Sequence, residues 1–167
     1  MACKLLLIRH GETVDNVNRI MQGQTPGKLT ENGINQARSL GAELSQEPID
    51  AFVSSDLQRA VDTCVEVAAP HFQGNRQTAL ANIFQTPLLR ERDWGSFTGR
   101  YIPDLKDAKW TPDIETTDAM RQRANAFLQL MRQRYDGKTV AAEVWKMLAR
   151  AVWRLPSSAS QCRKSSR

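Results

Sequence analysis

The sequence predicts an α/β fold, a three-layer sandwich in which a mostly parallel central sheet is flanked by helices. Short apolar runs alternate with amphipathic segments through the first 70 residues, in the order strand, helix, strand, helix. Crossover connections of this kind join parallel strands. The chain of 167 residues is also about the size of one ordinary domain. We therefore expect one hydrophobic core.

The first strand and the first long helix follow from apolar patterning. Residues 5–8 form a continuous apolar run, which is typical of a strand buried on both faces of a parallel sheet. Thr30 can cap a helix that continues to about Ser45, because Ile34 and Ala37 begin an apolar stripe at helical spacing.

The later elements are predicted in the same way. Residues 51–53 form a second short apolar strand, and Ser55 is expected to open the next helix, with a glutamine three residues later at the capping-box position. A long helix is expected over residues 117–134, followed by the start of another strand at 138–140. Residues 70–90 show no clear pattern.

Polar residues suited to phosphate chemistry follow the first strand and begin the second helix. A phosphoryl group is best bound by planar guanidinium groups and fixed backbone donors, and Arg9 and Arg59 meet the first need. Arg59 lies in a predicted first helical turn, where the helix dipole favours the same anion. His10 offers a neutral imidazole nucleophile, and Gly11 lets the backbone turn so that Arg9 and His10 can face one pocket.

These residues belong to an ordered set of motifs that resembles the histidine phosphatase (phosphoglycerate mutase-like) family over residues 4–140. The motifs are Arg9-His10-Gly11-Glu12-Thr13, Asn16, Gln22-Gly23, Leu29-Thr30-Glu31-Asn32-Gly33, Gln36-Ala37, Ser54-Ser55-Asp56-Leu57-Gln58-Arg59-Ala60 and Leu89-Arg90-Glu91-Arg92-Asp93-Trp94-Gly95.

The resemblance implies a phosphohydrolase that acts on phosphate monoesters. His10 would be phosphorylated transiently, Glu91 would be the general acid, and water would then release phosphate. The phosphate-binding residues would be Arg9, Arg59, Asn16, Thr13, Gln22 and Gly23. The resemblance implies no metal and no other cofactor, and the partner would be a small phosphorylated metabolite.

Within the family, a phosphatase is favoured over a phosphoglycerate mutase, which returns the phosphoryl group to its substrate. Residues 95–117 are short, and the segment 95–99 resembles the Gly-x-Trp-Glu-Gly of the broad-specificity phosphatases more than the longer mutase insertion. The sequence does not specify which ester is cleaved.

The resemblance fails at the second catalytic histidine, which the family places in a His-Gly pair after a late strand. The chain has two histidines, His10 and His71, and continues after Val140 as Ala-Ala-Glu-Val-Trp. Losing one preorganised donor of this kind typically costs about 10²–10³ in rate. An impaired phosphatase is therefore expected, and the alternative is an inactive relative that binds phosphorylated ligands.

Composition also changes at this point, which predicts a phosphatase-like domain at 1–140 and a divergent basic tail at 141–167. The whole net charge of +5 lies in this tail. The tail is expected to form one amphipathic helix through Val144, Leu148, Ala151 and Leu155 and to be disordered from residue 156. A frameshift and a natural truncated form both fit. A third hypothesis, a basic-tail module for RNA or an anionic membrane surface, is the least favoured.

The remaining expectations concern location and surface. No apolar run is long enough for a membrane helix, and residues 1–8 do not form a signal peptide, so a cytoplasmic location is expected, with neither membrane nor nucleic acid as partner. A homodimer is left open. Arg90, Arg92 and Asp93 are expected to be surface charges. Trp94 is expected to contribute to packing rather than to stack on bases.

Overall fold

The computed structural model describes residues 3–144. Its elements are β1 (Lys4–Ile8), α1 (Val14–Val17), α2 (Glu31–Leu44), β2 (Ala51–Ser55), α3 (Gln58–Ala68), the 3₁₀ helix η1 (Ala69–Phe72), α4 (Arg76–Ala81), β3 (Ile83–Thr86), the 3₁₀ helices η2 (Pro87–Leu89), η3 (Gly95–Phe97) and η4 (Ile102–Leu105), α5 (Thr117–Arg134) and β4 (Thr139–Glu143).

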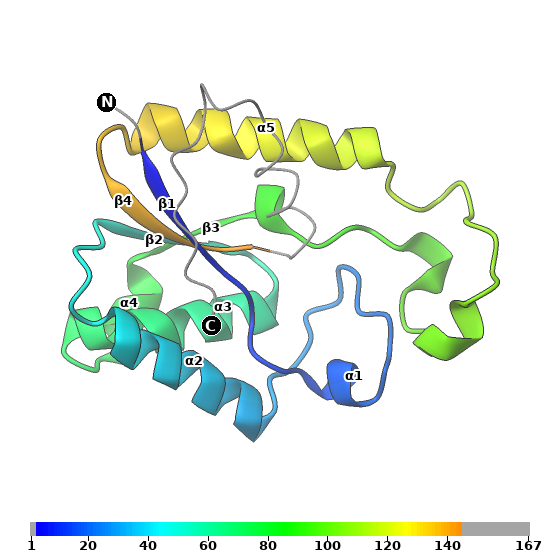
Figure 1. Cartoon of the computed structure of the whole chain (residues 1–167), viewed down its shortest axis with the longest axis horizontal. Helices are drawn as coiled ribbons and strands as arrows, with labels where there is room; N and C mark the ends of the chain where they lie inside the picture. The colour runs from blue at the N-terminus through cyan, green and yellow to red at the C-terminus, as the bar shows by residue number, and fades with distance from the viewer. Residues whose placement is uncertain (1–2, 145–167) are drawn as a thin grey trace.

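The four strands form one parallel sheet in the order β1-β4-β2-β3. Figure 1 shows α5 along one face of this sheet and α2, α3 and α4 along the other. The predicted three-layer α/β fold is therefore confirmed. The last described strand, β4, lies between β1 and β2, so its carboxyl end is close to the ends of both.

Residue alternation along β4 assigns each side chain to one layer. Val140 and Ala142 pack in the core beneath α5, together with Phe127, whereas Ala141 packs with Cys64 of α3 in the opposite core. Because alternate residues of a strand share a face, Glu143 follows Ala141 toward α3. All five residues from 140 to 144 are buried.

The predicted start of α2 is confirmed, and the predicted start of α3 is wrong. Thr30 is the N-cap of α2, and its side chain accepts a hydrogen bond from the Gly33 amide. Ser55 instead ends β2, and Leu57 occupies the N-cap of α3 without a side-chain cap bond. The Ser55 hydroxyl accepts from the Leu57 amide at 3.3 Å, so it stabilises the turn before the helix.

The prediction that β1 is buried on both faces is confirmed only in part, because Leu6 packs against one core and Leu5 and Leu7 pack against the other, but their burial is incomplete. Leu5, Leu6 and Leu7 are only half-buried, and Ile8 alone is buried. The reason is topological, because β1 is the edge strand of the sheet within residues 3–144. An apolar run predicts a strand, but it does not predict the strand's place in the sheet.

Two predictions about the tail lie outside the described residues, namely the amphipathic helix through Leu148, Ala151 and Leu155 and the disorder from Pro156. Among the helices of residues 3–144, none combines the length and the apolar character that crossing a bilayer requires.

Candidate active site

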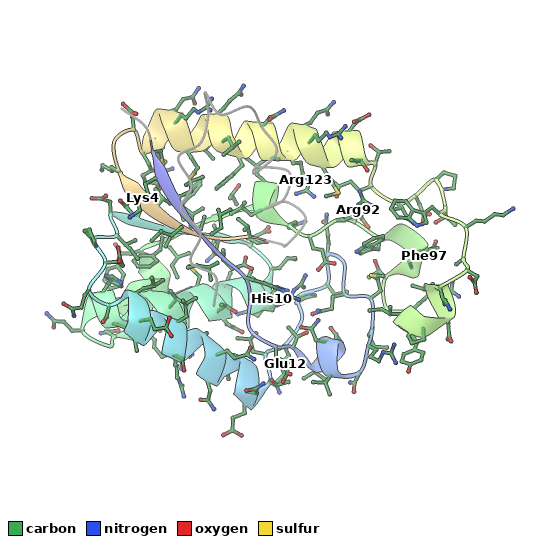
Figure 2. The ribbon with its side chains drawn as sticks, in the orientation of Figure 1. Lys4, His10, Glu12, Arg92, Phe97 and Arg123 are labelled. Carbon is green, nitrogen blue, oxygen red and sulfur yellow. The ribbon has the colours of Figure 1, made fainter. Side chains whose placement is uncertain are left out.

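A pocket lies where the carboxyl ends of β1, β2 and β4 meet the first turn of α3. It encloses about 190 Å³, part of it open to solvent, and its lining residues are His10, Ser55, Leu57, Arg59, Ala60, Leu89, Glu91 and Glu143. Figure 2 shows His10 just beyond the end of β1, with Glu12 further along toward α1. Three residues predicted from the sequence, His10, Arg59 and Glu91, are thus brought together.

His10 is held in one tautomer. Its Nδ1 lies 2.8 Å from the Gly11 carbonyl oxygen, which can only accept a hydrogen bond. Nδ1 therefore carries the proton and Nε2 keeps its lone pair. The pKa of His10 is lowered to about 4, chiefly by burial and also by the positive charges of Arg59 and Arg9, while the bond to the Gly11 carbonyl opposes the shift. The ring is neutral at pH 7, as a nitrogen nucleophile must be.

The backbone that follows His10 is fixed by close contacts. The Gly11 amide donates to Thr63 Oγ1 of α3 at 3.1 Å. A Cβ atom at Gly11 would collide with the carbonyl of Gly33 in the first turn of α2, and a Cβ atom at Gly33 would collide with the backbone of Glu12. Two glycines therefore let the chain after β1 touch α2 backbone to backbone.

Arg59 is almost completely buried, with its guanidinium inside a set of acceptors. One terminal nitrogen donates to the Thr25 carbonyl at 2.5 Å, and the other donates to the Gly23 carbonyl and to Glu91 Oε2, both at 2.9 Å. Its backbone amide bonds to the Pro26 carbonyl. Arg59 thus connects α3 to the loop 22–27 and presents a positive charge to the pocket.

Glu91 is buried rather than exposed, although it stands in a run of charged residues. Its carboxylate accepts from Arg59 and from Trp94 Nε1 at 3.1 Å. Burial raises the pKa of Glu91, while Arg59 and the Trp94 bond partly oppose the shift. A carboxyl group with a raised pKa beside a neutral histidine is suited to proton donation.

Glu143 is the site residue that the sequence analysis missed. It is 2% exposed at the end of β4, and burial raises its pKa to about 8. Its chain position could have signalled it, because it ends a predicted parallel strand beside the first one. It was instead assigned to the tail, since the resemblance to the family directs attention to a missing histidine.

The other predicted phosphate ligands do not line the pocket. Arg9 is exposed, although its charge is close enough to lower the pKa of His10 and Glu91. Thr13 and Asn16 form a capping box at α1, in which each side chain accepts from the other's amide. The Thr13 hydroxyl also donates to Gln22 Oε1 at 2.9 Å.

Gly23, the last of these predicted ligands, supplies backbone rather than a side chain. It adopts a left-handed φ of 54°, and its carbonyl accepts the bond from Arg59. A glycine suits this φ because it lacks a Cβ atom. Gly23 therefore contacts Arg59 directly, and the Thr13–Gln22 bond joins the start of α1 to the beginning of the same loop.

The prediction that Arg92 is a surface charge is wrong. It is 1% exposed, and its guanidinium lies 4.9 Å from the ring centre of Trp110 and 5.3 Å from that of Trp94. Its Nε contacts Met120 Sδ of α5. Arg90 is half-buried in an ion pair with Asp56 at 2.6 Å. These contacts fix the segment on both sides of Glu91.

Within residues 3–144, no group of three or more histidine, cysteine, aspartate or glutamate side chains is arranged to hold a metal ion. Two acids, a neutral histidine and a buried arginine are therefore the groups available for chemistry in the pocket. Such a set defines a site for an anion with a nitrogen nucleophile and a proton donor.

Comparison with known proteins identifies the class. The sequence profile of the Histidine phosphatase superfamily (branch 1) matches residues 5–159. The chain belongs to this superfamily, whose members are enzymes.

Individual relatives agree. The metal-independent phosphoserine phosphatase of Arabidopsis thaliana is 28% identical over 96% of this chain and 71% of its own length. The Proteus mirabilis protein named "Probable phosphoglycerate mutase GpmB" is 32% identical over 73% of this chain and 58% of its own. A mycobacterial glucosyl-3-phosphoglycerate phosphatase, solved with VO3, superposes with a TM-score of 0.74 and 26% identity, over 88% of this chain and 78% of that one. The chain thus spans only part of each relative's length.

Proposed function

We propose that this protein hydrolyses phosphate monoesters through a phosphohistidine at His10. The observation that carries the proposal is the state of His10, which is neutral at pH 7 and holds its proton on Nδ1 in a pocket shared with Arg59 and Glu91. The relatives support the same chemistry, because two of the three are named as phosphatases.

In the first step, His10 Nε2 attacks phosphorus and the bond to the ester oxygen breaks. Glu91, which burial favours in its protonated form, gives its proton to the leaving oxygen. In the second step, water attacks the phosphorus of phosphohistidine and returns a proton to Glu91. The phosphorus–nitrogen bond breaks, which restores His10 and releases phosphate.

Positive charge comes from Arg59 at the pocket wall and from Arg9 nearby. Arg59 also bonds to Glu91, so an arriving phosphoryl group competes with that carboxylate for the guanidinium. Protonation of Glu91 weakens this competition. Asn16, Thr13, Gln22 and Gly23 are proposed to help orient the phosphate indirectly, because the segment that they stabilise holds Arg59 through the Gly23 carbonyl.

The test is hydrolysis of an aryl phosphate by the purified chain, with trapping of acid-labile phosphate on the protein. His10→Ala should abolish both signals. His71→Phe is the matched control. The His71 ring packs against Phe52, with 5.2 Å between the ring centres, and His71 does not line the pocket. Turnover that survives in His10→Ala would contradict the proposal.

A second candidate is an inactive relative that binds phosphorylated ligands. The absence of any histidine after residue 71 favours it, since the family's second histidine has no counterpart in the sequence. Phosphate binding without turnover or trapped phosphate would support this candidate. A mutase-type transfer would instead appear as exchange of phosphate between two esters.

Three further proposals accompany the function. The substrate is a small phosphorylated metabolite in the cytoplasm, and a homodimer is the assembly to test by light scattering. The domain boundary predicted at residue 140 falls inside β4, so we propose that the domain includes residues 141–144 and that the basic tail follows them. Neither nucleic acid nor membrane is proposed as a partner.

A further inference from the structure

Glu143 lies beside the nucleophile because of the strand register. It pairs with Ile8 across the parallel β1–β4 ladder, and the Val144 amide donates to the Ile8 carbonyl at 2.8 Å. Ile8 packs in the α3-side core, and His10, two residues on, lines the same pocket as Glu143. Both side chains therefore reach the pocket from neighbouring strand ends.

Among residues 3–144, the buried Glu143 carboxyl group has no ion-pair partner. Its Oε2 atom has no hydrogen-bond partner in the described part of the chain. The nearby Arg59 guanidinium is already engaged by Glu91 and by the carbonyls of Gly23 and Thr25. A buried carboxylate without a bonded cation is costly, so the neutral form is favoured.

Burial, rather than the surrounding charges, favours a neutral Glu143 carboxyl group at pH 7. From α3, Arg59 favours the charged form, and the Cys64 thiol, whose own pKa is raised by burial and by Glu143, stays neutral. Glu91 opposes the charged form, the neutral His10 adds no charge, and the amides of His10 and Ser55 partly favour ionisation. Burial outweighs these effects and holds the pKa of Glu143 at about 8.

We propose that the Glu143 carboxyl group is a phosphate ligand, which donates its proton in a hydrogen bond to a phosphoryl oxygen bound in this pocket. This inference rests on the proposed function. Glu143 thus supplies, from the end of β4, the donor that the absent second histidine would have supplied. A protonated carboxyl has one O–H donor, whereas an ionised one has none and repels the anion.

The consequence is a loss of phosphate affinity at alkaline pH. At pH 9, one unit above the pKa of about 8, only about a tenth of the molecules retain the Glu143 proton. Because only this form is competent to bind, the apparent affinity should fall about tenfold. Glu143→Gln keeps a neutral N–H donor in nearly the same shape, so it should not show this loss.

The test is titration calorimetry of the full chain with inorganic phosphate between pH 6.5 and pH 9. Comparing wild type with Glu143→Gln at each pH cancels the ionisation of phosphate itself. We expect affinities within about threefold at pH 7 and a roughly tenfold advantage for Glu143→Gln at pH 9. Glu143→Leu, which has no donor, should bind about tenfold more weakly at pH 7, as expected for the loss of one good hydrogen bond.

Two results would overturn the inference. Equal pH dependence of wild type and Glu143→Gln would show that the Glu143 proton is not used. Tighter binding by both variants at every pH would show that Glu143 excludes phosphate. The comparison with glutamine decides the matter even if the leucine variant does not fold.

The same experiments distinguish failure of the proposed function from failure of the Glu143 inference. If no phosphate is trapped on His10 but the alkaline loss still depends on Glu143, the nucleophile proposal is wrong and the Glu143 inference stands. If phosphate is trapped on His10 but phosphate binding has the same pH dependence in wild type and Glu143→Gln, the nucleophile proposal stands and the Glu143 inference is wrong.

Discussion

The carboxyl ends of β1 and β4 are neighbours in one sheet, yet they differ in chemistry. Two residues beyond the end of β1 lies His10, whose pKa is lowered to about 4, and β4 ends in Glu143, whose pKa is raised to about 8. Burial is the leading cause of both shifts, because it disfavours the charged form of either group. The same environment thus yields a free base at one strand end and a retained proton at the other.

The largest expected effect is on turnover and separates the two strand ends. His10→Ala removes the nucleophile and should lower kcat by about 10³-fold or more. Glu143→Gln keeps a neutral donor and should retain turnover within about tenfold at pH 7. Aryl phosphate hydrolysis at saturating substrate measures both. Equal losses of kcat in the two variants would mean that His10 and Glu143 act as one unit. The proposed contrast between the two strand ends would then be wrong.

The next effect concerns Arg59, whose charge acts on both strand ends. Arg59→Met leaves Glu91 buried without its cation, so it should lower the free energy of unfolding by about 3 kcal/mol or more. Urea denaturation measures this loss. Arg121→Met is the matched control, since its ion pair with Asp118 is exposed and should contribute less than about 1 kcal/mol.

The pH dependence of stability should show the two strand ends acting in opposite directions. The folded pKa of His10 lies below its ordinary 6.5, so its contribution to stability is lost as pH falls from about 6.5 to about 4. The folded pKa of Glu143 lies above its ordinary 4.5, so its contribution is lost as pH rises from about 4.5 to about 8.

Thermal unfolding at pH 5 and pH 8 measures the second of these windows. Relative to wild type, Glu143→Gln should gain about 3 °C or more in Tm on going from pH 5 to pH 8. His10→Gln should not show this gain. An unchanged difference between wild type and Glu143→Gln would mean that Glu143 titrates near its ordinary pKa.

The smallest expected effect tests whether Glu91 is the general acid. Trp94→Phe removes the indole bond to Glu91 Oε1, which favours the charged carboxylate, so the pKa of Glu91 should rise further. The kcat/KM profile should shift to higher pH, with a change of about threefold at most. No shift would indicate that Glu91 is not the titrating acid.

The sequence predicted the parts of the molecule that depend on local pattern. The cap at Thr30, the helix over residues 117–134 and the strands at 51–53 and 138–140 all follow from periodicity, and the structure confirms them. The grouping of His10, Arg59 and Glu91 followed from the resemblance to a family, because these residues lie on three separate segments.

What the sequence did not predict depends on sheet order and on burial. An apolar run could not show that β1 lies at the edge of the sheet formed by residues 3–144, and residues 83–86 are too short a pattern to be recognised as β3. Arg92 resembles a surface charge until α5 and two tryptophans cover it. Glu143 can be recognised as a residue of the pocket only when β4 is known to lie between β1 and β2.

The bare backbone contact between Gly11 and Gly33 limits how this site can change over evolutionary time. Any side chain at either position would force α2 away from the turn that holds His10, because each Cβ atom would meet backbone that cannot rotate aside. A larger residue at one glycine cannot be offset by a change at the other, since neither can become smaller. Substitutions in the nucleophile loop should therefore be tolerated only where they leave this contact intact, because the separation of α2 from the turn that holds His10 is set by two backbones in contact.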